Sequence, residues 1–129
     1  MEKHNHLQSQ SMLPSQRGKE FETIAAKYLE KHGLKLVTRN FTAPCGELDL
    51  IMHTPEMLVF VEVRYRKNSY YGDGAESITQ TKQIRLKKTA LSFLKQYPKF
   101  HTWPCRFDVV SVSGSFPYQI TWIPNAIVT

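Results

Sequence analysis

The sequence has little that would indicate a disulfide scaffold or a zinc site. It contains only two cysteines, Cys45 and Cys105, which are far apart and form no CxxC pair. Its five histidines are scattered without the spacing of metal ligands. We therefore expect two reduced thiols, as in a protein of the cytoplasm.

The sequence also lacks long apolar segments. No run approaches the roughly 20 apolar residues that span a bilayer, and residues 1–11 contain no apolar signal core. We therefore expect a cytoplasmic protein with no membrane partner. We interpret residues 1–14 as a flexible polar tail and residues 15–129 as a single domain with one core.

Acidic residues are outnumbered by basic ones. Seventeen Lys and Arg against eleven Asp and Glu give a net charge of +6, and the basic residues concentrate between Arg64 and Lys99. A small basic protein attracts polyanions, above all nucleic acid. An adaptor whose basic face meets an acidic protein is an alternative that the composition leaves open.

Hydrophobic periodicity predicts two helices and five strands. The predicted helices cover residues 15–31 and the segment from Ser77 or Thr79 to about Tyr97, and the predicted strands cover residues 34–39, 47–53, 57–66, 105–112 and 118–123. We expect residues 40–46 to be a connection and the second and third strands to form an antiparallel hairpin. The second helix has an apolar side, for which we take Ile84, Ala90, Leu91, Leu94 and Tyr97. The element order α-β-β-β-α-β-β favours an α/β sandwich with a mixed sheet.

Two acids interrupt the apolar runs of this hairpin. Asp49 lies within Gly46-Glu47-Leu48-Asp49-Leu50-Ile51, and Glu62 lies within Leu58-Val59-Phe60-Val61-Glu62-Val63-Arg64. Strict alternation puts Leu48, Leu50 and Met52 on one face of the second strand. The sheet would then have one wholly apolar face, and its opposite face would carry first the acids and then the basic residues. Buried acids need a partner, and a divalent cation is the natural one. The alternative is an edge strand whose polar face meets water.

These residues resemble a known family. An acid on one strand followed by an acid-x-basic unit on the next is similar to the PD-(D/E)xK nuclease motif. More closely, the chain resembles the YraN family of uncharacterised bacterial proteins. The ordered elements that carry this resemblance are Phe21-Glu22, Tyr28-Leu29, Arg39-Asn40, Gly46 to Ile51, Val59 to Arg66, Tyr71-Gly72, Lys82 and Arg106-Phe107-Asp108. The resemblance implies a restriction-endonuclease-like three-layer sandwich, with a central mixed sheet flanked by helices, similar to Holliday-junction resolvases.

The resemblance also implies a site. Asp49 and Glu62 match metal-binding acids, and Glu22 matches an acid that resolvase-like members bring from the first helix. Mg²⁺ or Mn²⁺ is the implied ion, and the backbone carbonyl of Val63 can complete its ligands. Arg64 stands where the nuclease motif has lysine. Arginine cannot be a general base, but it can hold the scissile phosphate.

Basic and aromatic residues after the acids form the predicted nucleic-acid contacts. They are Arg66, Lys67, Tyr71, Lys82, Arg85 and Lys88. Lys82 can also supply an ammonium group in place of the motif lysine, whose position is occupied by Arg64. Asp108 is better explained as a structural partner of Arg106. The leading hypothesis is a metal-dependent endonuclease acting on DNA, branched DNA included; the alternative is a non-catalytic nucleic-acid-binding module with the same fold. Pairing of two sites in a homodimer is left open.

Overall fold

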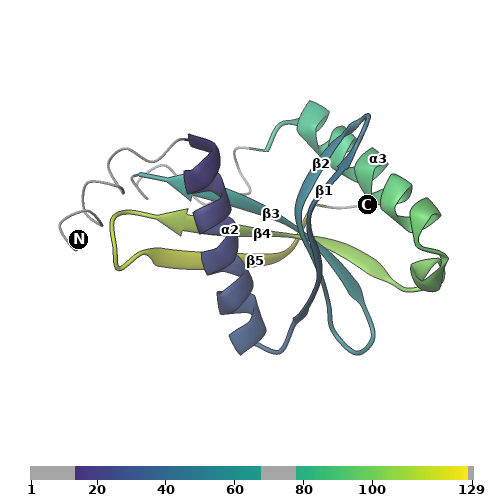
Figure 1. Ribbon diagram of the computed structural model, residues 1–129, viewed down its shortest axis with the longest axis horizontal. Helices are drawn as coiled ribbons and strands as arrows, with labels where there is room; N and C mark the ends of the chain where they lie inside the picture. Colours follow the sequence, from purple (N-terminus) through teal and green to yellow (C-terminus); the bar gives the residue numbers. More distant parts are fainter. Residues whose placement is uncertain (1–13, 68–77, 128–129) are drawn as a thin grey trace.

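A mixed β-sheet forms the centre of the described structure (Figure 1). The computed structural model describes residues 14–67 and 78–127. Within these ranges the sheet has five strands in the order β1-β2-β3-β4-β5; β3 and β4 run parallel, and the other neighbours run antiparallel. The elements are α2 (Pro14–Lys31), β1 (Lys35–Ala43), β2 (Gly46–His53), β3 (Leu58–Arg66), α3 (Gln80–Gln96), η3 (Pro98–Phe100), β4 (Cys105–Ser113) and β5 (Gln119–Ile127). This is the predicted α/β sandwich of restriction-endonuclease-like architecture.

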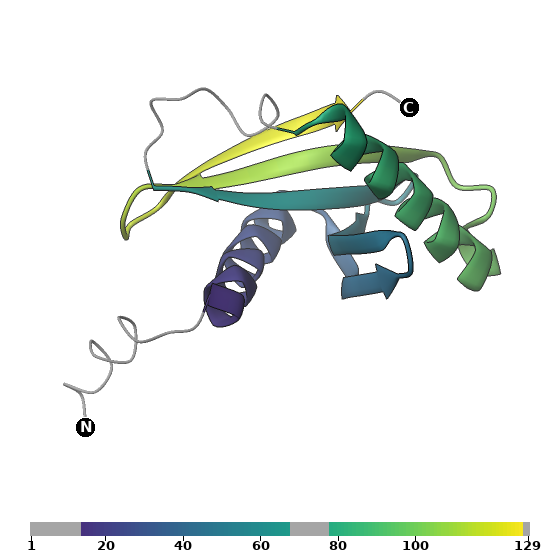
Figure 2. The same cartoon turned by 90° about the horizontal axis from the view of Figure 1, so that it is seen from above.

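The two helices cover opposite faces of the sheet. Successive residues of a strand point to opposite sides, and the buried residues of β3 divide in this way. Val59 and Val61 pack in a cluster with Ala25 and Leu29 of α2. Phe60 packs in a second cluster with residues of α3. Figure 2 shows α2 and α3 meeting the sheet at different ends. The prediction of one apolar and one polar face is therefore wrong, because a helix buries each face.

The helix predictions are confirmed in position, and one of them is wrong in its buried face. Thr79 caps α3 by accepting a hydrogen bond from the backbone N–H of Lys82 at 3.1 Å. The side that α3 buries is formed by Leu86, Thr89, Ala90 and Phe93. Ile84 and Leu91, which we expected to be buried, are 46% and 59% exposed. Both rows have helical spacing, so the pattern alone could not choose between them.

Strand β1 is longer than predicted, and the predicted connection at residues 40–46 is shorter. Residues 40–43 continue β1, and only Pro44 and Cys45 connect it to β2. The cause lies at Asn40, which has a φ of 53° between the ladder pairs Arg39↔Leu50 and Phe41↔Leu48. Asparagine tolerates this left-handed conformation, so the strand continues through a local twist.

Next to the twist at Asn40, the residues of β2 do not keep to the faces that alternation predicted. Leu50 and Met52 lie in the cluster under α2, as one face. Leu48 instead joins the cluster under α3. Asp49, which stands between Leu48 and Leu50, is therefore at the point where β2 turns away from the sheet.

Some expectations concern parts of the chain that the structure does not describe. Residues 1–13 of the predicted tail and residues 68–77, which include Tyr71, lie outside the described residues. No helix in the described ranges is both long enough and apolar enough to cross a bilayer.

Candidate metal and nucleic-acid site

Strands β2 and β3 separate at the two acids. Their ladder begins at His53↔Leu58 and ends at Leu50↔Val61. Beyond that point, within residues 14–67 and 78–127, the ladder of β3 continues with β4 alone, as far as Arg66↔Ser113. Asp49 and Glu62 occupy the next position of the β2–β3 register, where the ladder has stopped. We call this opening the fork.

Asp49 is held inside the fork by the backbone of β3. The N–H of Val63 donates a hydrogen bond to Oδ2 of Asp49 at 2.8 Å. The Asp49 side chain thus accepts the hydrogen bond of a β3 N–H that has no backbone partner on β2. This contact fixes the orientation of the carboxyl group.

The surroundings of Asp49 disfavour its charge. Burial, followed by the negative charge of Glu62, raises the pKa of Asp49 from 3.8 to about 8. The hydrogen bond from Val63 works in the opposite direction, while Glu22 and Glu47 add to the increase. A pKa of about 8 favours the protonated form of Asp49 at neutral pH, and a cation at this position would oppose the shift by favouring the ionised carboxylate.

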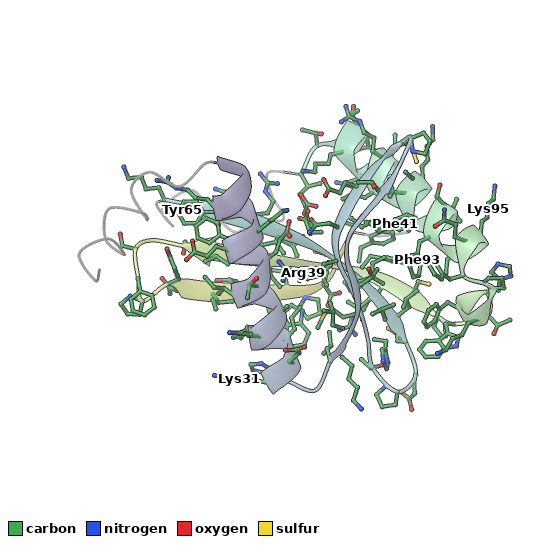
Figure 3. All side chains as sticks on the ribbon, viewed as in Figure 1. Lys31, Arg39, Phe41, Tyr65, Phe93 and Lys95 are labelled. Carbon is green, nitrogen blue, oxygen red and sulfur yellow. The ribbon has the colours of Figure 1, made fainter. Side chains whose placement is uncertain are left out.

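Glu22 reaches the same place from α2. Its side chain is largely buried, and within the described residues its Oε1 has no hydrogen-bond partner. Burial raises the pKa of Glu22, and the side chains of Asn40 and Arg39 partly oppose that effect. Arg39 Nη2 lies 3.6 Å from Glu22 Oε1 and donates a hydrogen bond to the carbonyl of Lys19 at 3.0 Å. Figure 3 shows Arg39 on the side of β1 that faces α2.

Arg39 and Asn40 are the contributors that sequence reasoning missed. The pattern around them was interpreted as the end of a strand, although the family resemblance included both residues. The signal that could have found them is an asparagine between two strand segments, a residue type that accepts the left-handed conformation.

Lys82 joins the acids from the first turn of α3. Its Nζ lies 2.7 Å from Oε2 of Glu62, whose side chain is 7% exposed, whereas that of Lys82 is 45% exposed. The capping of α3 by Thr79 places this lysine over the fork. The structure thus brings together Glu22, Asp49, Glu62 and Lys82 from four different elements.

Two adjoining hollows open at the fork, and both are lined by Asp49, Glu62 and Lys82. One, of ≈ 180 Å³, extends to Glu47 and Arg85. The other, of ≈ 270 Å³, is lined in addition by residues of α2 and of β3. These are Gly18, Phe21, Glu22, Val63 and Tyr65. A ligand could therefore contact the acids from either side of the fork.

The donor set fits an open site for a hard cation. Across residues 14–67 and 78–127, no three His, Cys, Asp or Glu side chains converge as a ready-made metal cage. Mg²⁺ rarely uses such cages, because it keeps several waters and takes one or two carboxylates together with substrate phosphate. The repelling acids at Asp49 and Glu62 and the unsatisfied oxygen of Glu22 match that requirement. The ligand role of the Val63 carbonyl stays a prediction.

The predicted phosphate contacts occupy varied positions. Arg85 lines a hollow, and Lys88 is exposed further along α3. Arg66 and Lys67 lie at the end of β3. Arg64 is half-buried and lines neither of the two hollows. Among the described residues, Lys82 rather than Arg64 forms the ion pair with Glu62.

Asp108 has the structural environment that the sequence suggested. It is fully buried and accepts hydrogen bonds from Arg106 Nε at 2.9 Å and Nη2 at 3.1 Å. Trp122 Nε1 and the N–H of Asn125 donate to it at 2.9 and 2.8 Å. All of these partners are on β4 and β5, so the hydrogen bonds of Asp108 hold these two strands together and do not involve the acids of the fork.

Comparison with known proteins supports the expected resemblance. The family model for "Uncharacterised protein family UPF0102" matches residues 21–112. A UPF0102 protein of Vibrio parahaemolyticus is 43% identical over 112 residues, which cover 87% of this chain and 92% of that protein. One of Pectobacterium carotovorum is 46% identical over 113 residues, covering 87% and 93%. One of Coxiella burnetii is 46% identical over 106 residues, covering 82% and 87%. The matched range of residues 21–112 spans the positions of Glu22, Asp49, Glu62 and Lys82.

Proposed function

The chain belongs to the UPF0102 family, the YraN group, and we propose that it is a divalent-metal-dependent nuclease that hydrolyses phosphodiester bonds in DNA. One observation carries the proposal. The fork holds Asp49 beside Glu62, and burial together with the negative charge of Glu62 raises the pKa of Asp49 to about 8. Strained acid pairs of this kind are typical of functional sites rather than of structural ion pairs.

Each residue of the fork has a role in this proposal. Asp49 and Glu62, with Glu22 beside them, would hold Mg²⁺ or Mn²⁺, and the bound ion would supply Lewis-acid stabilisation and an activated water. The Val63 N–H keeps Asp49 oriented. The Lys82 ammonium, which now contacts Glu62, neutralises charge that develops on the phosphate. Arg64 and Arg85 supply further positive charge for the DNA backbone.

The test is cleavage of labelled DNA by the purified protein with Mn²⁺. Duplex, flapped and four-way substrates are compared, with wild type beside Asp49→Asn, Glu62→Gln and Glu56→Gln. Glu56 is an exposed acid in the turn between β2 and β3, so its variant is the matched control. We expect both fork variants to lose activity on the order of 100-fold. Intact DNA with wild type, or equal cleavage by Asp49→Asn, overturns the proposal.

A non-catalytic DNA-binding protein is the second candidate, and Arg64 is the observation that favours it. Arg64 stands in place of the motif lysine, while the exposed basic side chains of Arg85, Lys88 and Lys95 lie along α3. This candidate predicts salt-dependent DNA binding that survives Asp49→Asn. Binding that required both Mg²⁺ and the two acids would contradict it.

A further inference from the structure

Four aromatic rings gather beside the fork. Phe21 of α2 stacks on Tyr65 of β3 with ring centroids 4.3 Å apart and planes 2° from parallel. Tyr118 meets the edges of both rings, at 5.5 and 6.4 Å. Phe116, in the turn between β4 and β5, lies 6.1 Å from Tyr118. We call these four rings the aromatic platform, and Figure 3 shows Tyr65 beside the first turns of α2.

The platform is ordered without being buried. The Tyr65 hydroxyl donates a hydrogen bond to the carbonyl of Gly114 at 2.8 Å, which together with Phe21 fixes its ring. Tyr65 is nevertheless 42% exposed, and Phe116 is 84% exposed. Large exposed aromatic groups that are already fixed in place are typical of binding surfaces rather than of cores.

The platform is continuous with the acids. Phe21 and Tyr65 line the same hollow as Glu22, Asp49 and Glu62. Tyr65 follows Glu62 by three residues on one strand, a separation of roughly 10 Å along an extended chain. A nucleotide chain with a phosphate at the acids could therefore place a neighbouring base on the platform.

We propose that the platform stacks an unpaired base of a DNA strand next to the phosphate held at the fork. This inference rests on the proposed function and names its substrate class. Bases inside a duplex have their faces covered by their neighbours, so only an unpaired or splayed base can offer its face to Tyr65 or Phe116. The preferred substrate is then DNA with single-stranded character at the site, such as a flap or an opened junction.

Charges near the platform are mixed, and the rings therefore carry the recognition. Burial raises the pKa of Tyr118, and the charges of Glu20 and Arg17 raise and lower it respectively. Lys67 follows Tyr65 by two residues, directly after β3. A purely electrostatic contact would prefer duplex, which has the higher charge density. Stacking instead predicts a preference for single strands.

The experiment measures binding with Ca²⁺ in place of Mg²⁺ or Mn²⁺, so that an oxygen-preferring cation occupies the fork, using a single-stranded oligonucleotide with a fluorescent adenine analogue and the same sequence as a duplex. Wild type, Tyr65→Leu and Phe116→Ala are compared with Leu91→Ala, whose exposed apolar side chain is on α3. We expect quenching of the unpaired analogue by wild type. We also expect about tenfold weaker single-strand binding by each platform variant, with duplex binding unchanged. Phe116→Ala removes an exposed side chain and so tests the inference even if Tyr65→Leu unfolds.

Several outcomes overturn the inference. Equal loss of single-strand and duplex binding would show a general effect, and absence of quenching would exclude stacking. Normal DNA affinity in both variants would leave the platform free for another partner, such as a protein. If wild type cleaves DNA with Mn²⁺ while the platform variants keep full single-strand affinity, the platform inference fails and the nuclease proposal stands. If wild type neither binds nor cleaves DNA, both fail.

Discussion

Asp108 on β4 and Asp49 on β2 are acids of one sheet with opposite surroundings. Asp108 is fully buried, yet it accepts hydrogen bonds from Arg106, Trp122 and Asn125. Asp49 is less buried and receives the Val63 N–H, but it faces other carboxylates. Burial alone therefore does not identify a functional acid. The informative difference is whether the neighbours of the acid favour its charge or oppose it.

The largest expected effect comes from removing the satisfied acid. Asp108→Ala leaves Arg106 and the Trp122 N–H without their acceptor in a buried setting, and we expect it to destabilise the fold by about 3–5 kcal/mol. Urea denaturation measures this change, with Glu56→Ala as a control that should be nearly neutral. A loss of stability below about 1 kcal/mol would contradict the structural role assigned to Asp108.

The opposite sign is expected at the fork. Since the pKa of folded Asp49 is raised from 3.8 to about 8, folding favours its protonated form. Its contribution to stability is present below about pH 4 and is lost as the pH rises through about 8. Asp49→Asn cannot ionise and can still accept the Val63 N–H, so it should gain stability over wild type across that range.

The gain of Asp49→Asn at about pH 9 should be at least about 1.4 kcal/mol, the equivalent of one pKa unit. Thermal or urea unfolding in EDTA, repeated from about pH 4 upward, gives the difference between the two proteins. Glu56→Gln, in which an exposed acid changes, should follow wild type at every pH. A difference that does not vary with pH would contradict the assignment of Asp49 as a strained acid.

A smaller effect is expected at Lys82, which contacts Glu62 in the absence of a divalent ion. Lys82 is 45% exposed, but Glu62 is only 7% exposed, so Lys82→Met should cost about 1 kcal/mol of stability, at the upper end for a surface pair. The ammonium and a cation compete for the same carboxylate, so the variant should bind Mg²⁺ several-fold more tightly. Isothermal titration calorimetry measures this, with Lys95→Met on the outer part of α3 as the matched control. Unchanged Mg²⁺ affinity would contradict the competition between the Lys82 ammonium and the metal ion for Glu62.

Local patterns were sufficient to predict most of the elements. The apolar stripe of α2, the alternation in β2 and β3, and the turn at residues 53–56 each depend on neighbours in the sequence. The left-handed conformation of Asn40 is permitted by its residue type but not required by it, so the local pattern indicated a candidate position and did not predict that the strand continues through it. The parallel pairing of β3 with β4 depends on contacts between segments that are distant in the sequence.

The candidate site was predictable in part for a similar reason. Asp49 and Glu62 were identifiable as acids within apolar runs. Glu22 was suggested only by the resemblance, since a helix glutamate beside an apolar stripe is usually solvated. The contact of Lys82 with Glu62 depends on where α3 crosses the fork, which no local pattern specifies.

The bond between the Val63 N–H and Asp49 Oδ2 makes one backbone proton a reporter of the site. Its chemical shift depends on whether the carboxylate that accepts it is protonated, ionised or bound to a cation. In a ¹⁵N-labelled sample, the Val63 amide resonance should therefore move when Mg²⁺ is added, and it should follow the ionisation of Asp49 in a pH titration. The state of the fork could then be observed directly, with neither a substrate nor a reaction.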